Sequence, residues 1–285
     1  MTPTGFLSDE PIGTHFIDNG DIRPIDELAD RTSKVMGFVY EVVRIIDGVP
    51  LFLEEHAARL VRSARLTDTH LKVPAEHLSD FIGELVRHTG LTTGNVKVAL
   101  GGGNPSEDVC LISFIASRYP ADAMYQNGVS VGIFSGERHN PTVKQYNPEL
   151  RRRLRTKLEK SGHHDLLLES ADRFLTEGSK HNVFLVDHDT LITPPENDVL
   201  PGITRMKVIQ IAARLDIPLI ETRVHRRDLG GFDAAFLTGT SAKLLPIHTI
   251  DGRSFRVDHP QVRRLMAEYD RLIDEYVRNC RAASS

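Results

Sequence analysis

The sequence predicts an α+β fold in two domains, and three observations support this prediction. A strand pair near the N-terminus is followed by amphipathic helices and by further apolar, strand-like segments. A short polar stretch, Arg118–Asp122, then interrupts the apolar pattern. After it, strands and helices alternate again up to a long amphipathic helix at the C-terminal end. We therefore expect a small N-terminal domain over residues 1–120 and a larger C-terminal domain over residues 121–285.

The predicted first domain opens with a β-hairpin. Phe38–Ile46 is rich in β-branched and aromatic residues, and Asp47-Gly48 is typical of a hairpin turn. Val49–Leu53 is expected to form the second strand of the hairpin. Apolar residues lie on both faces of the first strand, which indicates that both faces are covered. The other elements expected in this domain are helices at about Glu54–Arg65 and from Pro74 onward, and strands at Val96–Leu100 and Val109–Ala116.

The predicted second domain alternates strands with helices around a large core. Its last helix carries apolar residues at helical spacing from Val262 to Val277, which is typical of a helix packed on a sheet. The expected strands are Val129–Phe134, Asp165–Leu168, Asn182–Val186, Leu191–Thr193, Pro218–Thr222 and Ala234–Leu237, and the expected helices are about Pro148–Ser161 and Thr204–Leu215.

Composition excludes several classes of protein. The chain has 35 basic and 39 acidic side chains, a net charge of −4, so it lacks the basic field of a nucleic-acid-binding protein. The longest apolar run, Val109–Ala116, is too short to span a membrane, and the N-terminus has no secretory signal pattern. The only cysteines, Cys110 and Cys280, make no disulfide framework. We expect a reduced, cytoplasmic protein.

Lysine is scarce in this chain, and one lysine has an unusual position. Lys144 lies in an irregular segment between a predicted strand and a predicted helix, where a rigid scaffold can hold a reactive amine. On position alone, an ordinary surface lysine remains the favoured interpretation. His163-His164-Asp165 resembles a metal site only by composition and is interpreted as a solvated turn, and we expect no metal.

Three polar segments could bind a small charged ligand. Leu200–Arg205 leads directly into a helix, so that its N–H groups and the Thr204 hydroxyl could bind phosphate; alternatively, Thr204 simply caps the helix. Leu237–Ala242 places hydroxyls and a glycine after a strand, as an anion site or only a tight turn. Glu177 lies in a polar segment before an apolar strand and could hold a protonated ring nitrogen or cap a turn.

The order of these segments resembles that of the class IV (fold type IV) aminotransferases, the pyridoxal phosphate enzymes that include branched-chain and D-amino-acid aminotransferases. The resemblance covers about Arg31 to Asp251. It rests on Val39-Tyr40-Glu41-Val42-Val43-Arg44, His56-Ala57-Ala58-Arg59-Leu60, Thr176-Glu177-Gly178-Ser179 with Asn182-Val183-Phe184, Leu191-Ile192-Thr193-Pro194 and Leu200-Pro201-Gly202-Ile203-Thr204-Arg205.

The resemblance implies a fold and a set of residue roles. It implies a small α+β domain followed by a larger α/β domain with a mixed sheet. Lys144 would form the Schiff base with pyridoxal 5'-phosphate and shuttle the proton. Glu177 would pair with the pyridine nitrogen, Leu200 would pack on the ring, and Tyr40 and Ser241 would face the substrate. The residues that would bind the cofactor phosphate are Arg59, Ile203, Thr204 and Thr240.

The chain departs from the family pattern at three places. Met36-Gly37-Phe38 stands where the family carries Gly-Asp-Gly, which predicts a reshaped pocket near Tyr40. Leu100–Asn104 has neither the Arg nor the His with which D-amino-acid enzymes hold a carboxylate. Lys180 stands where small or polar residues are usual, and we expect it to point outward.

The resemblance implies an aminotransferase that acts on an amino acid and a 2-oxo acid. Two alternatives stay open: a lyase on the same scaffold, similar to aminodeoxychorismate lyase, and a relative that keeps the fold without catalysis. The family also implies a homodimer with the neighbouring subunit completing the site. The apolar faces of Phe38–Ile46 agree with a covering partner, although helices of the same chain could cover them equally well.

Overall fold

A computed structural model describes residues 10–33, 35, 38–101 and 108–283 of the chain. Two of the departures from the family pattern, at Met36-Gly37 and within Gly102–Asn104, lie outside the described residues. The chain divides into two compact units: unit 1 comprises residues 1–118, 143–148 and 273–285, and unit 2 comprises residues 119–142 and 149–272. The division into domains 1–120 and 121–285 stays a prediction.

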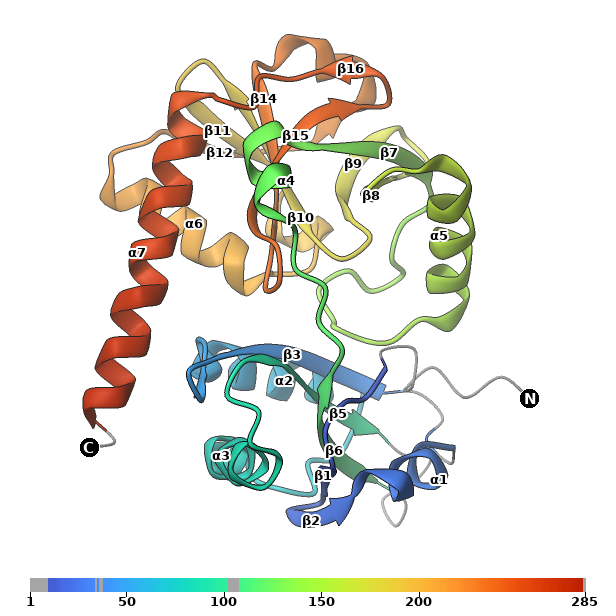
Figure 1. Ribbon diagram of the computed structural model, residues 1–285. Helices are drawn as coiled ribbons and strands as arrows, with labels where there is room; N and C mark the ends of the chain where they lie inside the picture. Colours follow the sequence, from blue (N-terminus) through green and yellow to red (C-terminus); the bar gives the residue numbers. More distant parts are fainter. Residues whose placement is uncertain (1–9, 34, 36–37, 102–107, 284–285) are drawn as a thin grey trace. The chain divides into compact units, whose positions relative to one another are not determined.

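Unit 1 is built on an antiparallel sheet with the strand order β2-β1-β6-β5-β3-β4 (Figure 1). The long strand β3 pairs over its whole length with β5, so that Tyr40 lies opposite Ala99. The elements of unit 1 are β1 (His15–Asp18), β2 (Asp21–Pro24), η2 (Ile25–Glu27), α1 (Leu28–Ser33), β3 (Phe38–Ile46), β4 (Val49–Pro50), α2 (Leu53–Leu66), η3 (Ala75–His77), α3 (Leu78–Thr89), β5 (Gly94–Gly101) and β6 (Val109–Ile115).

The two faces of the unit 1 sheet pack against different parts of the same chain. Val39, Val43 and Ile45 join a core with helices α2 and α3, which cover one face of the sheet (Figure 1). Phe38 and Tyr40 belong to a second core on the other face, together with residues of β1 and α1. The prediction that both faces of this strand are covered is confirmed, and the cover comes from the chain itself. This feature therefore gives no independent support for a dimer.

A short segment around Lys144 joins the open edge of β3, although the residues on both sides of it belong to unit 2. The Tyr40 N–H donates to the Lys144 carbonyl at 3.0 Å, and the Tyr146 N–H donates to the Phe38 carbonyl at 2.9 Å. The ring of Tyr146 stacks on that of Phe38, with centroids 4.9 Å apart. Hydrogen bonds and ring stacking thus fix Lys144 beside Tyr40.

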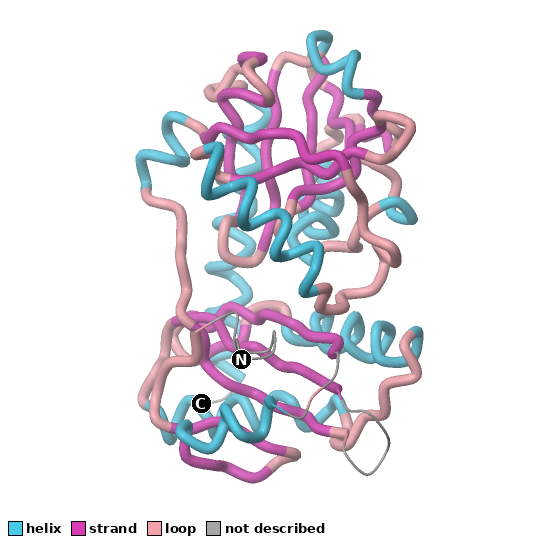
Figure 2. The backbone as a smooth tube through the Cα atoms, turned by 90° about the vertical axis from the view of Figure 1, so that its right-hand side faces the viewer, coloured by secondary structure: helices cyan, strands magenta, loops and turns pink. Residues whose placement is uncertain are grey.

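Unit 2 contains a large mixed sheet that curls on itself, with the strand order β12-β11-β10-β14-β15-β7-β8-β9-β13 (Figure 2). Its elements are α4 (Asp122–Asn127), β7 (Val129–Ser135), α5 (Pro148–Ser161), β8 (Asp165–Glu169), β9 (Phe174–Gly178), β10 (Asn182–Asp187), β11 (Thr190–Thr193), η4 (Glu196–Asp198), α6 (Ile203–Arg214), β12 (Leu219–Glu221), β13 (Val224–His225), η5 (Arg226–Gly231), β14 (Ala234–Gly239), β15 (Lys243–Ile250), β16 (Arg253–Ser254) and α7 (Pro260–Ala283), whose residues from Ile273 onward belong to unit 1.

The helices of unit 2 pack on the sheet through their apolar stripes. Leu150 and Leu154 of α5 join Leu166 and Leu168 of β8 in one core, while α6 packs on β14. In α7, Tyr269 is buried. The α+β class and the large mixed sheet are thus as the sequence predicts. No helix among the described residues is both long and apolar enough to cross a bilayer.

Candidate active site

A buried carboxylate, that of Glu41, is the centre of the candidate site in unit 1. Its Oε1 accepts a hydrogen bond from Arg59 Nε at 2.7 Å, and its Oε2 accepts one from Arg59 Nη2 at 2.7 Å. His56 Nδ1 lies 2.8 Å from Oε2, and Lys144 Nζ lies 3.6 Å from the same oxygen. One carboxylate therefore holds both Arg59 and Lys144, the two basic residues that the family resemblance assigns to the cofactor.

The neighbouring charges keep Glu41 ionised. Burial by itself raises the pKa of this carboxyl, but the charges of Arg59 and Lys144 and the hydrogen bonds lower it far below its ordinary value of 4.5. Burial also lowers the pKa of His56. Glu41 opposes this change, while the charges of Arg59 and Lys144 lower the pKa further. The imidazole is therefore neutral near pH 7, and its Nδ1–H donates to the ionised carboxylate.

This arrangement predicts how unit 1 responds to acid. Because folding lowers the pKa of Glu41, its ionisation stabilises the folded state above about pH 4.5, and this contribution is lost as the pH falls further. We expect Glu41→Gln to lower the urea midpoint at pH 7 and to lower it by a smaller amount near pH 3, because part of the Glu41 contribution is already lost there. A difference between wild type and variant that stays constant over this range would contradict the prediction.

Lys144 is positioned by its backbone and by an aromatic ring. Its N–H donates to Ser63 Oγ at 3.3 Å, and its Nζ lies 5.4 Å from the centre of the Tyr40 ring. The side chain of Lys144 is 15 % exposed, so that the amine remains accessible to a small molecule. A second lysine, Lys97, is fully buried, with Nζ 5.3 Å from the same ring centre. The structure thus brings Tyr40, Arg59 and Lys144 together in unit 1.

In unit 2, Glu177 is held by three partners. Its Oε1 forms an ion pair with Arg138 Nε at 2.8 Å. Its Oε2 accepts the Leu200 N–H at 3.3 Å and the Asn182 amide at 3.5 Å. Glu177 is 3 % exposed and lies in strand β9, not in the loop that the sequence predicts. This strand brings the carboxylate to the segment that leads into α6.

The segment before α6 is held mainly by Asn182. The Asn182 amide donates to the Leu200 carbonyl at 2.8 Å. Helix α6 begins at Ile203 with Gly202 as its N-cap residue, so the interpretation of Thr204 as the cap is wrong. The Thr204 hydroxyl instead lies 3.4 Å from the Tyr269 hydroxyl, in the buried first turn of the helix. As in any helix, the first N–H groups of α6 lack partners within the helix itself, and N–H groups of this kind can bind an anion.

A substitution at Gly202 should disturb the segment before α6. A Cβ at this position would overlap the Asn182 amide oxygen, so that either the helix start or Asn182 must move. We expect Gly202→Ala to lower the free energy of unfolding by about 1–3 kcal/mol, the usual cost of overpacking. Thermal unfolding measures the change, and Gly231→Ala is the control, because a Cβ there meets nothing within 4 Å. Equal stability of the two variants would contradict the prediction.

The remaining predicted residues lie near a turn in unit 2. Thr240 and Ser241 occupy the turn between β14 and β15, beside the strand on which α6 packs. Lys180 is exposed, as expected. A cavity of about 290 Å³ is lined by Glu177 and Arg138 together with Ser170 and Arg223.

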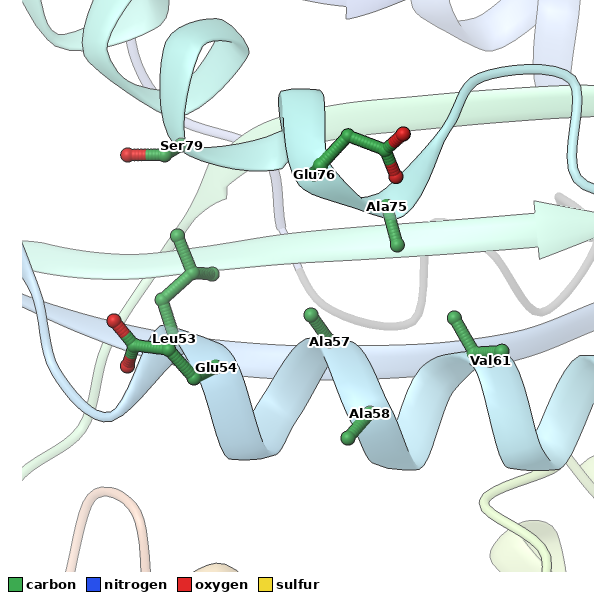
Figure 3. Close-up of a pocket in the computed structure, with 8 residues that line it drawn as sticks. All are labelled: Leu53, Glu54, Ala57, Ala58, Val61, Ala75, Glu76 and Ser79. Atoms are coloured by element: carbon green, nitrogen blue, oxygen red, sulfur yellow. The ribbon is translucent and has the colours of Figure 1, made fainter.

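A larger cavity, of about 540 Å³, lies in unit 1 between α2 and η3. Leu53, Ala57 and Val61 point toward the segment that carries Ala75 and Glu76 (Figure 3). None of the residues that line it belongs to the Glu41 cluster. The cavity is therefore separate from the candidate site.

Sequence reasoning missed several residues of these two groups. Glu41 could have been noticed as the one acidic residue inside an apolar strand, and Asn182 as the polar residue that opens another. Nothing in the sequence marks Arg138 as a partner of Glu177. The interpretation of His163-His164-Asp165 as a solvated turn is wrong for Asp165, which is 1 % exposed and begins β8.

Comparison with known proteins places the chain in a family. A family model described as amino-transferase class IV matches residues 38–250. The chain belongs to this family. The match spans both candidate groups, from Tyr40 to Thr240, and members of the family bind pyridoxal 5'-phosphate.

Individual class IV relatives differ in their activities. A D-alanine aminotransferase of Bacillus licheniformis is 28 % identical over 240 residues, covering 80 % of this chain and 84 % of the relative. A branched-chain-amino-acid aminotransferase of Pseudomonas aeruginosa is 25 % identical over 256 residues, with 82 % and 83 % covered. The crystal structure of a branched-chain aminotransferase from Thermoproteus uzoniensis with norvaline is similar at a TM-score of 0.81 and 26 % identity, covering 92 % and 95 %.

The residues present fit the cofactor of the class IV family. Its phosphate needs cations and N–H donors; unit 1 contains a guanidinium at Arg59, and unit 2 contains a helix start at α6. Its aldehyde needs an accessible amine, which Lys144 supplies. Its ring nitrogen needs an acidic partner, which Glu177 supplies from a fixed position. Each unit thus carries a part of the donor set.

Proposed function

We propose that this class IV protein is a pyridoxal-phosphate-dependent aminotransferase that moves an amino group between an amino acid and a 2-oxo acid. The observation that carries the proposal is the Glu41 cluster, in which one buried carboxylate holds an amine and a guanidinium. Curated relatives with this activity include both branched-chain and D-alanine enzymes. We therefore propose substrates of the branched-chain or D-amino-acid type.

Different residues are proposed for the ring nitrogen and for the phosphate of the cofactor. Glu177 would accept a hydrogen bond from the pyridine nitrogen, while Arg138 and Asn182 keep its carboxylate in place. Leu200, whose N–H already donates to Glu177, would pack on the ring. The residues proposed for the phosphate are Arg59, Ile203, Thr204 and Thr240.

Lys144 would carry the proton in both half-reactions. When bound, the cofactor supplies an electron sink for the bonds broken at the amino acid Cα. The Lys144 amine would accept the proton lost from this carbon and donate it to C4′ of the cofactor, and it would carry the proton the opposite way in the second half-reaction. Glu41 Oε2 lies 3.6 Å from this amine and helps to position it, and the centre of the Tyr40 ring lies 5.4 Å from it. Tyr40 and Ser241 would face the substrate.

A visible absorption spectrum tests the proposal directly. The purified protein is titrated with pyridoxal 5'-phosphate, and a panel of D- and L-amino acids is then added with 2-oxoglutarate or pyruvate as acceptor. We expect an absorption band near the visible edge that shifts with one enantiomeric series. Pyruvate release from aminodeoxychorismate without an acceptor would replace the proposal by a lyase. A protein that forms no band would be a fold relative without this catalysis.

We also propose that the protein is a homodimer, as the family resemblance implies and as most symmetric oligomers are. Light scattering at micromolar concentration tests this. We expect twice the chain mass of 31.9 kDa. A fully active species with the mass of one chain would refute the dimer.

A further inference from the structure

A second buried carboxylate in unit 2, that of Asp165, binds the segment that follows Glu177. Its Oδ1 accepts the Ser179 N–H at 3.1 Å and also the Ser179 hydroxyl. Its Oδ2 lies 2.6 Å from Nδ1 of His181. Burial raises the pKa of Asp165, but the charge of His181 and these hydrogen bonds lower it below its ordinary value, so that the carboxylate is ionised.

Asp165 and His181 lie directly against two glycines of the candidate site. A Cβ at Gly178, next to Glu177, would lie 2.5 Å from Asp165 Oδ2. A Cβ at Gly239, next to Thr240, would lie 2.7 Å from Cδ2 of the His181 ring. Gly239 has no positive φ, so the ring contact and not the backbone conformation is what disfavours a side chain there. The two side chains therefore occupy the space that both glycines leave open.

This contact joins two segments that are far apart in sequence. Asp165 fixes Ser179 and His181 after Glu177, and the Gly178 N–H donates to the His181 carbonyl at 2.6 Å. The His181 ring then supports the backbone immediately before Thr240. We propose that Asp165 and His181 are positioning residues that set the spacing between Glu177 and the turn of Thr240. The inference rests on the proposed function, in which these two positions hold the ring nitrogen and the phosphate.

The confined position of the His181 ring affects how well a cofactor that carries a phosphate can bind. His181 is only 15 % exposed on its side chain, and one side of its ring is close to His164, with ring centroids 6.2 Å apart. Such a confined ring has little freedom to move away, so a change in its size is transmitted to Gly239. Loss of the ring should loosen the turn of Thr240 and weaken phosphate binding more than ring binding.

Two substitutions separate this role from simple stability. His181→Asn keeps an N–H donor for Asp165 but removes the ring beneath Gly239. Gly239→Ala adds a methyl group that collides with this ring. Because the collision requires both partners, the two changes should be coupled in a double-mutant cycle. His188→Asn is the matched control, since His188 lies on the exposed turn at the other end of β10.

Binding of pyridoxal 5'-phosphate and of pyridoxal, measured by absorbance titration, is compared for each variant. We expect His181→Asn and Gly239→Ala each to raise Kd for the phosphate form about ten-fold, with much less effect on pyridoxal. The double variant should bind better than the product of the single effects predicts. His188→Asn should bind like wild type.

The outcomes distinguish the inference from the proposed function. Wild type that binds neither compound would refute the proposed function, and this inference with it. If wild type binds the cofactor and His181→Asn shows the same preference for pyridoxal 5'-phosphate over pyridoxal as wild type does, only the inference is overturned. Thermal midpoints of wild type, the two single variants and the double variant test the steric contact without any cofactor, and additive changes for His181→Asn and Gly239→Ala would also overturn it.

Discussion

Lys144→Ala should lower transamination at least about 10³-fold, the scale expected when a positioned proton-transfer group is removed. The variant should still fold, with a free energy of unfolding within about 1 kcal/mol of wild type. The reason is that Arg59 and His56 continue to bind Glu41 when the lysine is absent. Steady-state rates and urea unfolding measure the two quantities.

Lys180→Ala provides the control for this experiment. Lys180 is exposed and lies after Glu177 in sequence, so its loss should leave both the rate and the spectrum unchanged. If Lys144→Ala kept the absorption band and the wild-type rate, the assignment of the lysine would be wrong. Loss of the band in Lys180→Ala instead would move the role to that residue.

The second large effect is expected at Glu41. Glu41→Ala leaves the Arg59 guanidinium buried without its carboxylate, and breaking a buried pair in this way typically costs about 3–5 kcal/mol. Glu41→Gln keeps the shape of the side chain and should cost less. Urea unfolding monitored at pH 7 measures both variants.

Glu76→Ala is the comparison for Glu41, because Glu76 is an exposed glutamate of the same unit. Its loss should change the free energy of unfolding by less than about 0.5 kcal/mol. A Glu41→Ala variant as stable as Glu76→Ala would show that Arg59 finds another partner. In that case Glu41 would not be what holds Arg59 in place.

The sequence predicted the order of most elements because apolar periodicity is a local property. Helix α5 has the bounds expected, and strand β3 runs from Phe38 to Ile46 as predicted. Strands β9 and β15 were not predicted. In β9, Thr176 and Glu177 read as polar loop residues, yet both are buried, and Glu177 contacts Arg138 and Leu200, which are distant in sequence. Burial decided by such partners is not visible in a local pattern.

The candidate site was predictable in its parts and not in its connections. Lys144 was placed correctly between a strand and a helix, but its pairing with the edge of β3 is a non-local contact. Glu41 appeared only as part of a strand, although its carboxylate binds both basic residues. Thr204 was interpreted as a possible cap, and only the structure shows that Gly202 takes that position. Contacts between residues distant in sequence account for the first two differences, and the third concerns only the residue at which the helix begins.

The discontinuous make-up of unit 1 has a consequence for biosynthesis. Glu41, His56 and Arg59 leave the ribosome well before Lys144, and Tyr276, whose hydroxyl donates to Glu54 at 2.8 Å, is made much later still. The nascent unit lacks its added edge segment until residues 143–148 are made, and it lacks the end of α7 until the last residues are made. Contacts between such distant stretches form slowly, because a long loop must close first. Unit 1 therefore reaches its complete form only after the whole of unit 2 has been synthesised.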